Sequence, residues 1–183
     1  MTITAEETIH GGAILRLLED LQNVTPAVHV HLAHNPAERS VYSLTLLDED
    51  LKKIKIGLYV KSSRKRLSPW RYTLTREHQN EIKKLRSASD ALFIVLINGT
   101  DGYLTLNYKS LKKILDEDFA ESEWISVKRK LKEHYRVAGT DGELDHPVAR
   151  NSYPSQVVEY VTAWETPKLE ADGVWETLKK FWS

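Results

Sequence analysis

Hydrophobic and polar side chains alternate most regularly about a third of the way along the chain. The apolar members of this pattern are Ile54, Ile56, Leu58 and Val60. Successive residues of a β-strand point to opposite faces, so the pattern predicts a strand over about 54–61 that buries these side chains. The other face of the strand then carries Tyr59 and Lys61 together, and a basic loop, residues 64–71 (RKRLSPWR), follows directly.

Three further patterns precede this strand. Thr4 and Glu7 have the spacing of a capping box, and apolar residues then recur at helical intervals, so a helix is predicted over about 5–23. Valine and leucine alternate with histidine over residues 28–34, which predicts a first strand. The β-branched and aromatic residues at 40–48 predict a second strand, which forms an antiparallel hairpin with the strand described above.

After the basic loop, Thr75 is in position to cap a helix that extends to about residue 86. The continuous apolar run at 91–98 predicts a strand that is covered on both faces. The first half of the chain therefore has the order helix, three strands, helix, strand over about residues 5–98.

The second half predicts a hairpin strand followed mainly by helices. A four-residue turn leads into a strand at 103–108. Residues 110–115 and 122–135 have helical spacing, and the buried side of the second helix would carry Trp124, Val127 and Leu131. Two segments near the C-terminus predict a strand or helix at 155–164 and a helix at 173–182.

The composition is that of a globular protein with a real core. A chain of 183 residues with 41% hydrophobic and 28% charged residues fits one domain. We therefore expect a single α/β domain over residues 1–183, in which a mixed sheet occupies the core at 1–98 and an additional hairpin and an α-rich extension occupy 99–183. Disulfides and thiolate metal sites are excluded because the chain has no cysteine.

Neither the N-terminus nor any other segment has the apolar run of a signal peptide or of a membrane span, which needs about 18 residues. We therefore expect a cytoplasmic protein without a membrane partner. The net charge is zero, with 26 basic and 26 acidic residues, but the basic ones are concentrated. Residues 61–76 carry no acidic side chain and six basic ones: Lys61, Arg64, Lys65, Arg66, Arg71 and Arg76. A neutral protein can thus present a basic groove.

The order of elements over about 5–98 resembles the core of the PD-(D/E)xK nuclease superfamily. Residues 59–78 (YVKSSRKRLSPWRYTLTREH) resemble the lysine-bearing strand and following helix of its Mrr-like and restriction-endonuclease-like members. In that family, an Asp on the second strand and an acidic residue two positions before the lysine bind a divalent metal, which activates water together with the lysine. The resemblance implies that Lys61 is the catalytic lysine and that Mg²⁺ or Mn²⁺ is the cofactor if the protein is active.

The acidic positions of this motif are missing. Tyr59 stands two residues before Lys61. If the hairpin turn is centred near residues 50–51, Tyr59 lies across from Tyr42 or Ser43. Asp48 is then about 17 Å away along the hairpin, too far to share a metal with residue 59. Because Tyr and Ser do not replace two anionic ligands, we expect a scaffold that has lost hydrolysis and holds no metal cofactor.

The residue types of the basic loop are typical of nucleic-acid binding, because cationic groups bind phosphates and aromatic rings stack on bases. The candidate binding residues are Lys61, Arg64, Lys65, Arg66, Trp70 and Arg71. The alternative is a solvated loop whose Trp70 packs on the core. The resembling families act on DNA, in phage defence, counter-defence or DNA processing, which favours DNA over RNA as the partner.

Two other functions stay open. The first is an active Mg²⁺- or Mn²⁺-dependent endonuclease whose acids come from elsewhere, with Glu19, Asp20 and Glu38 as candidates. The second is a protein-interaction module, in which the tryptophan-rich C-terminus forms a homo-oligomer or partner interface. We expect a protein without catalytic activity, associated with nucleic acid.

Overall fold

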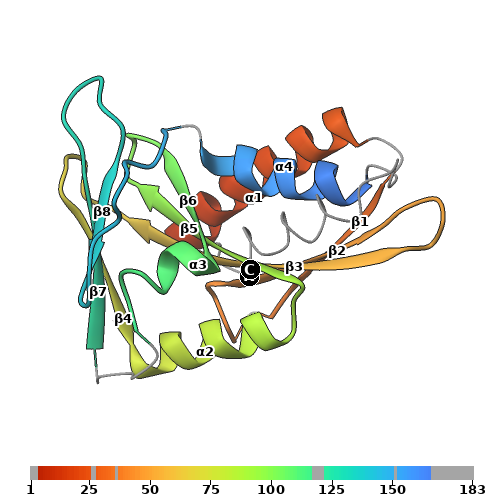
Figure 1. Cartoon of the computed structure of the whole chain (residues 1–183), viewed down its shortest axis with the longest axis horizontal. Coiled ribbons are helices and arrows are strands. Elements are labelled where there is room, and N and C mark those ends of the chain that lie inside the picture. The colour runs from red at the N-terminus through yellow and green to blue at the C-terminus, as the bar shows by residue number, and fades with distance from the viewer. Residues whose placement is uncertain (1–3, 26–27, 36, 117–121, 151, 166–183) are drawn as a thin grey trace.

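The computed structural model describes residues 4–25, 28–35, 37–116, 122–150 and 152–165. These residues form two β-sheets and four helices (Figure 1). The strands are β1 (His29–His34), β2 (Val41–Leu47), β3 (Lys53–Ser63), β4 (Trp70–Thr75), β5 (Ala91–Asn98), β6 (Tyr103–Asn107), β7 (Ser122–Lys128) and β8 (Arg136–Gly139). The helices are α1 (Ala5–Val24), α2 (Arg76–Ser87), α3 (Tyr108–Leu111) and α4 (Ser152–Glu165).

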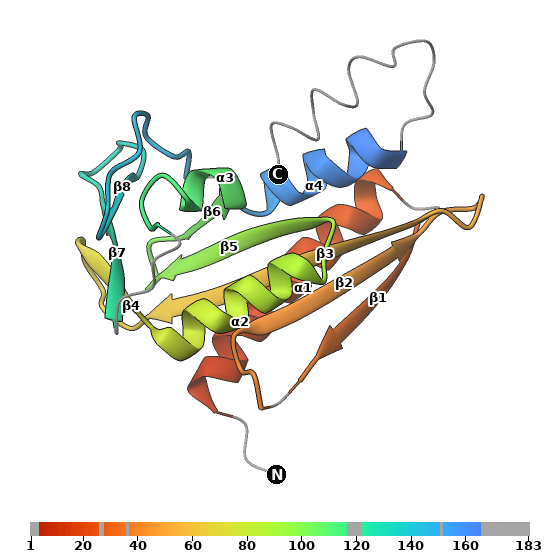
Figure 2. The same cartoon turned by 60° about the horizontal axis from the view of Figure 1, so that its bottom comes forward.

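The larger sheet has five strands in the order β1-β2-β3-β5-β6. Strands β1 to β3 form an antiparallel meander, β5 runs parallel to β3, and β6 returns antiparallel to β5. Helices α1 and α4 cover one face of this sheet and α2 lies on the other (Figures 1 and 2). Every residue of β5 is buried, because both of its faces are covered. The predicted α/β fold with a mixed sheet is confirmed.

Helix α2 lies unusually close to the sheet at β3. Thr75 caps the helix by accepting a hydrogen bond from the backbone N–H of His78, as its position in the sequence predicts. A β-carbon on Gly57 of β3 would lie only 2.7 Å from Cγ of Leu85 on this helix. Glycine at this position therefore lets the last turn of α2 approach β3, while the first turn lies at Lys61, where His78 contacts its Nζ.

The register of the central hairpin differs from the prediction. Tyr59 is paired with Val41 rather than with Tyr42 or Ser43. The turn is centred on Asp50, because Leu47 pairs with Lys53 across it. A one-residue change of register reverses the face of a partner side chain. Tyr42 accordingly packs in the core under α1, whereas Tyr59 packs in the core on the α2 side.

The smaller sheet has the order β4-β7-β8 and replaces a predicted helix. The helix expected at 122–135 is wrong, since residues 122–128 form a strand that pairs with β4. Glu123, Ile125 and Val127 are its buried residues, which is the two-residue period of a strand. Leu131, expected in the core, is 83% exposed. The extension beyond residue 98 therefore contains strands where helices were expected.

The described chain ends in helix α4, so the strand-or-helix alternative at 155–164 is decided in favour of a helix. Val157 and Val161 of this helix are fully buried in the core shared with α1. The helix predicted at 173–182 lies outside the described residues. None of the described helices is long and apolar enough to cross a membrane.

Candidate nucleic-acid interface

Lys61 lies where β3 extends past the first residue of β2, so its remaining neighbouring strand is β5. The side chain is half-buried, and its Nζ lies 3.1 Å from Nε2 of His78 in the first turn of α2. Burial lowers the pKa of Lys61, while the negative charges of Glu6 and Glu81 oppose that shift. Burial, followed by the charge of Lys61, also lowers the pKa of His78.

The tautomer of His78 determines what this contact can be. The backbone N–H of Thr75 donates to Nδ1 of His78 at 3.2 Å. A neutral ring that accepts at Nδ1 carries its proton on Nε2, and Nε2–H can donate to Lys61 only when the amine is unprotonated. The geometry therefore disfavours a positive charge on both groups at once, in keeping with the direction of the two pKa shifts.

Glu81 of α2 supplies a carboxylate beside the position where the nuclease motif has its acid. Its Oε2 accepts a hydrogen bond from the hydroxyl of fully buried Tyr59 at 3.1 Å. Burial raises the pKa of Glu81, and the hydrogen bond from Tyr59 opposes this. From the sequence, Glu81 was interpreted as a surface residue of the second helix, because nothing near it in the chain indicates that it reaches Tyr59. Its signal was its spacing three residues after His78, which places both on one face of α2.

The acids proposed as relocated ligands do not gather at Lys61. Asp20 lies 3.5 Å from Arg16 near the far end of α1, fourteen residues or about 20 Å along the helix from Glu6. Glu38 forms an ion pair with Lys84 of α2 at 3.1 Å, and its negative charge acts on Glu81. Glu6, which the sequence did not single out, is the acid of α1 whose charge acts on Lys61.

In the described residues, three acidic ligand atoms come within 4.8 Å of one another at Asp116, Glu123 and Asp141. Carboxylate oxygens in this number could hold a hard divalent cation. Acidic side chains often cluster without one, and we assign no function to this group. Asp116 and Glu123 of this group line a pocket that also includes Gln79, Ile82 and Lys83 of α2.

The basic loop links β3 to β4 and is held firmly in place. Arg64, Lys65 and Arg66 are exposed, whereas Trp70 is only 2% exposed. The indole Nε1 of Trp70 donates to the backbone carbonyl of Lys65 at 2.8 Å. Trp70 is thus a core residue that anchors the loop, and the expectation that its ring stacks on a nucleic-acid base is corrected.

A second basic segment lies beside this loop. Strand β4 pairs with β7, and the backbone N–H of Arg129 donates to Oγ of Ser68 at 3.0 Å. The residues that follow β7 therefore lie next to the basic loop, although about sixty positions separate them in the sequence. We call the exposed basic residues of the two segments and of β8 the basic surface: Arg64, Lys65, Arg66, Arg71, Lys128, Lys130, Lys132 and Arg136.

Arg129 itself is engaged within the protein. Its guanidinium forms a bidentate ion pair with Asp101. The carboxylate of Asp101 also accepts a hydrogen bond from the hydroxyl of Tyr135 at 2.8 Å. The hydrogen bonds from Arg129 lower the pKa of Asp101. Arg129 therefore ties the turn between β5 and β6 to the smaller sheet and is not counted in the basic surface.

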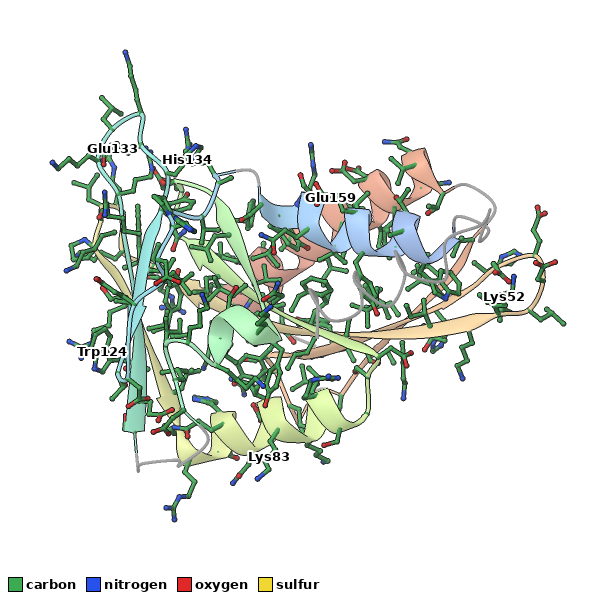
Figure 3. The ribbon with its side chains drawn as sticks, in the orientation of Figure 1. Lys52, Lys83, Trp124, Glu133, His134 and Glu159 are labelled. Atoms are coloured by element: carbon green, nitrogen blue, oxygen red, sulfur yellow. The ribbon has the colours of Figure 1, made fainter. Side chains whose placement is uncertain are left out.

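The aromatic side chain associated with the basic surface is Trp124. It is half-buried on the outer face of β7, and the guanidinium of Arg71 lies 4.6 Å from the centroid of its ring. Figure 3 labels Trp124 beside β7 at the margin of the molecule. Sequence reasoning placed Trp124 in the core of a helix, so it missed this pairing of a cation with an aromatic face.

Comparisons with known proteins found no family model, no curated protein and no solved structure that matches this chain.

Proposed function

We propose that the protein binds nucleic acid through the basic surface, on a scaffold of the PD-(D/E)xK type that no longer hydrolyses its ligand. The observation that carries this is the meeting of two basic segments at one end of a small sheet whose outward side also carries Arg71 stacked on Trp124. Cations gathered on one side of a neutral protein favour a polyanionic partner, because phosphates release counterions when basic side chains neutralise them.

The surroundings of Lys61 support the loss of hydrolysis. Its Nζ contacts His78, and the group of three acids that the described residues bring together lies elsewhere, at Asp116, Glu123 and Asp141. A phosphodiesterase of the metal-dependent kind needs carboxylates that converge beside its lysine. We retain DNA as the favoured ligand and phage defence or DNA processing as the setting, both on the strength of the family resemblance.

A second candidate function is an active Mg²⁺- or Mn²⁺-dependent nuclease. The observation that favours it is Glu81, whose carboxylate contacts Tyr59 and acts electrostatically on Lys61. With Glu38 close enough for its charge to act on Glu81, a metal could recruit both carboxylates. In this case cleavage requires Mn²⁺ and is lost in both Lys61→Ala and Glu81→Gln.

The deciding experiment titrates the purified protein against labelled single- and double-stranded DNA and RNA at low and moderate salt, with and without Mn²⁺. We expect a salt-sensitive shift on native gels and no cleavage. The double variant Lys65→Gln/Arg66→Gln should lower the slope of log affinity against log salt by about 1.4 to 1.8, which is 0.7 to 0.9 per phosphate contact.

A matched control is Lys52→Gln/Lys53→Gln, at the tip of the β2–β3 hairpin, on the opposite side of the molecule from Trp124 (Figure 3). This variant removes the same charge and should leave the salt slope unchanged. If the salt slope fell equally in the two double variants, binding would depend on the net charge of the protein rather than on the basic surface. No shift in any lane would favour a protein-interaction module instead.

A further inference from the structure

The smaller sheet has one face in the core and one face that no described helix covers (Figure 1). The inward residues are large and buried: Trp70, Tyr72, Leu74, Ile125, Val127 and Val137. The outward residues are exposed or half-buried and form what we call the outer face: Arg71, Thr73, Trp124, Ser126, Lys128 and Arg136. These residues combine one aromatic ring with three cations, and one carboxylate, that of exposed Glu143, borders them through the pairing of Glu143 with Ala138 of β8.

Two cations of the outer face are placed directly against each other. Lys128 of β7 and Arg136 of β8 are cross-strand partners. Like charges at such a position destabilise a sheet. In the described part of the chain, no carboxylate lies within 4.0 Å of either charged group. A bound phosphate would relieve this repulsion, so the pair points to an anionic ligand at this end of the face.

The other end of the outer face offers a surface for stacking. Trp124 pairs with Thr73 across the strands, so its ring has a small neighbour on one side and the guanidinium of Arg71 on another, 4.6 Å from the ring centroid. Trp124 and Lys128 lie on the same face four residues apart, about 13 Å along the strand. A ligand with flat rings and phosphates in succession would meet both.

We propose that the outer face binds single-stranded nucleic acid, with a base stacked on Trp124 and the backbone on Lys128, Arg136 and the basic loop. This rests on the proposed function and names the form of the ligand. In a duplex the base faces are stacked within the helix, and only base edges are open to side chains in the grooves. An indole on an open sheet face can stack only on an unpaired base.

The test measures fluorescence anisotropy with labelled oligothymidylate, oligouridylate and a blunt DNA duplex of the same length. We expect both single strands to bind more tightly than the duplex. Trp124→Ala should weaken single-strand binding by about 5- to 150-fold, the range for one lost stacked base, and leave duplex binding unchanged. Trp124→Phe should restore most of the affinity. Leu15→Ala, an exposed apolar residue of α1 outside the outer face, should bind as the wild type does.

Different results would refute the outer-face site for single strands and nucleic-acid binding by the basic surface. Salt-sensitive binding that is equal for duplex and single strands, and indifferent to Trp124→Ala, would refute the outer-face site while leaving the basic surface intact. Absence of binding to all three probes would refute both. If Trp124→Ala does not fold, the wild-type preference for single strands and the Trp124→Phe variant still decide the question.

Discussion

The Lys61 site and the outer face of the smaller sheet use basic side chains in opposite ways. Lys61 is half-buried, contacts His78 and lies in the field of Glu6 and Glu81. Lys128 is exposed and faces another cation, Arg136, across two strands. Lys61, which resembles the lysine of a family motif, has polar and acidic neighbours within the protein. Lys128, which matches no motif, lies opposite another cation and has no carboxylate beside it in the described residues. An unbalanced charge is the better indicator of where a charged partner binds.

The aromatic residues show the same contrast. Trp70 belongs to the basic loop by sequence, yet its ring is in the core and its indole N–H supports the loop backbone. Trp124 follows an acidic stretch in the sequence, yet it lies among cations on the outer face. Neighbours along the chain therefore misidentify which tryptophan can reach a ligand, because alternate residues of a strand face opposite ways.

Among the variants that distinguish the Lys61 site from the outer face, Gly57→Ala is expected to have the largest effect, a loss of unfolding free energy. The added methyl group collides with Leu85, and displacing α2 should cost about 1–3 kcal/mol of unfolding free energy. Because α2 carries His78 and Glu81, the substitution disturbs the Lys61 site directly, whereas α2 packs against the inward face of the smaller sheet and not against its outer face. We expect a lower denaturation midpoint in urea together with unchanged affinity for single strands in the folded protein.

Its control is Gly11→Ala on α1, where nothing lies within 4 Å of the added carbon. Alanine should stabilise the helix there by about 1 kcal/mol relative to glycine. A Gly57→Ala protein as stable as the wild type would mean that α2 does not need its close approach to β3.

A smaller effect should distinguish the two lysines directly. Lys128→Gln removes one phosphate contact, so it should weaken nucleic-acid binding severalfold and lower the salt slope by about 0.7 to 0.9. Lys61→Gln should leave both quantities within error, since that side chain is already engaged with His78. The reverse result, in which Lys61→Gln abolishes binding, would place the ligand at the Lys61 site and contradict the difference between the two regions.

The smallest effect concerns pH. His10 of α1 is 1% exposed, and burial lowers its pKa below the usual 6.5, with the charge of Glu6 opposing and those of Lys61 and His34 adding to the shift. Below about pH 6.5 the unfolded chain then binds more protons than the folded one, so stability falls as pH decreases. Urea titrations from pH 7.5 to 5 should show this loss.

His10→Gln should flatten that dependence, whereas His31→Gln on exposed strand β1 should not. His78 contributes to the loss in the same direction, because its pKa is also lowered. A wild-type protein that becomes more stable on acidification over this range would show that the neutral form of His10 is not the one the fold prefers.

Much of the fold could be predicted because its signals are local. The capping box at Thr4, the N-cap at Thr75, the alternation in β3 and the apolar run of β5 depend on neighbours a few residues apart, and these predictions are confirmed. The smaller sheet has no such signal. Strands β4 and β7 pair across about fifty residues, and the inward position of Glu123 hides the alternation of β7 behind a charged side chain.

The candidate sites, like the fold, were predictable from the sequence only where their signals are local. The sequence by itself determined which segments are basic, which strand carries Tyr59 and Lys61, and that the acids of the nuclease motif are missing from those positions. Only the tertiary structure decided that Glu81 reaches Tyr59, that Trp70 is buried, and that Lys128 and Arg136 meet on the face that also carries Trp124. Periodicity determines which face of an element a side chain occupies, but long-range strand pairing determines what that face meets.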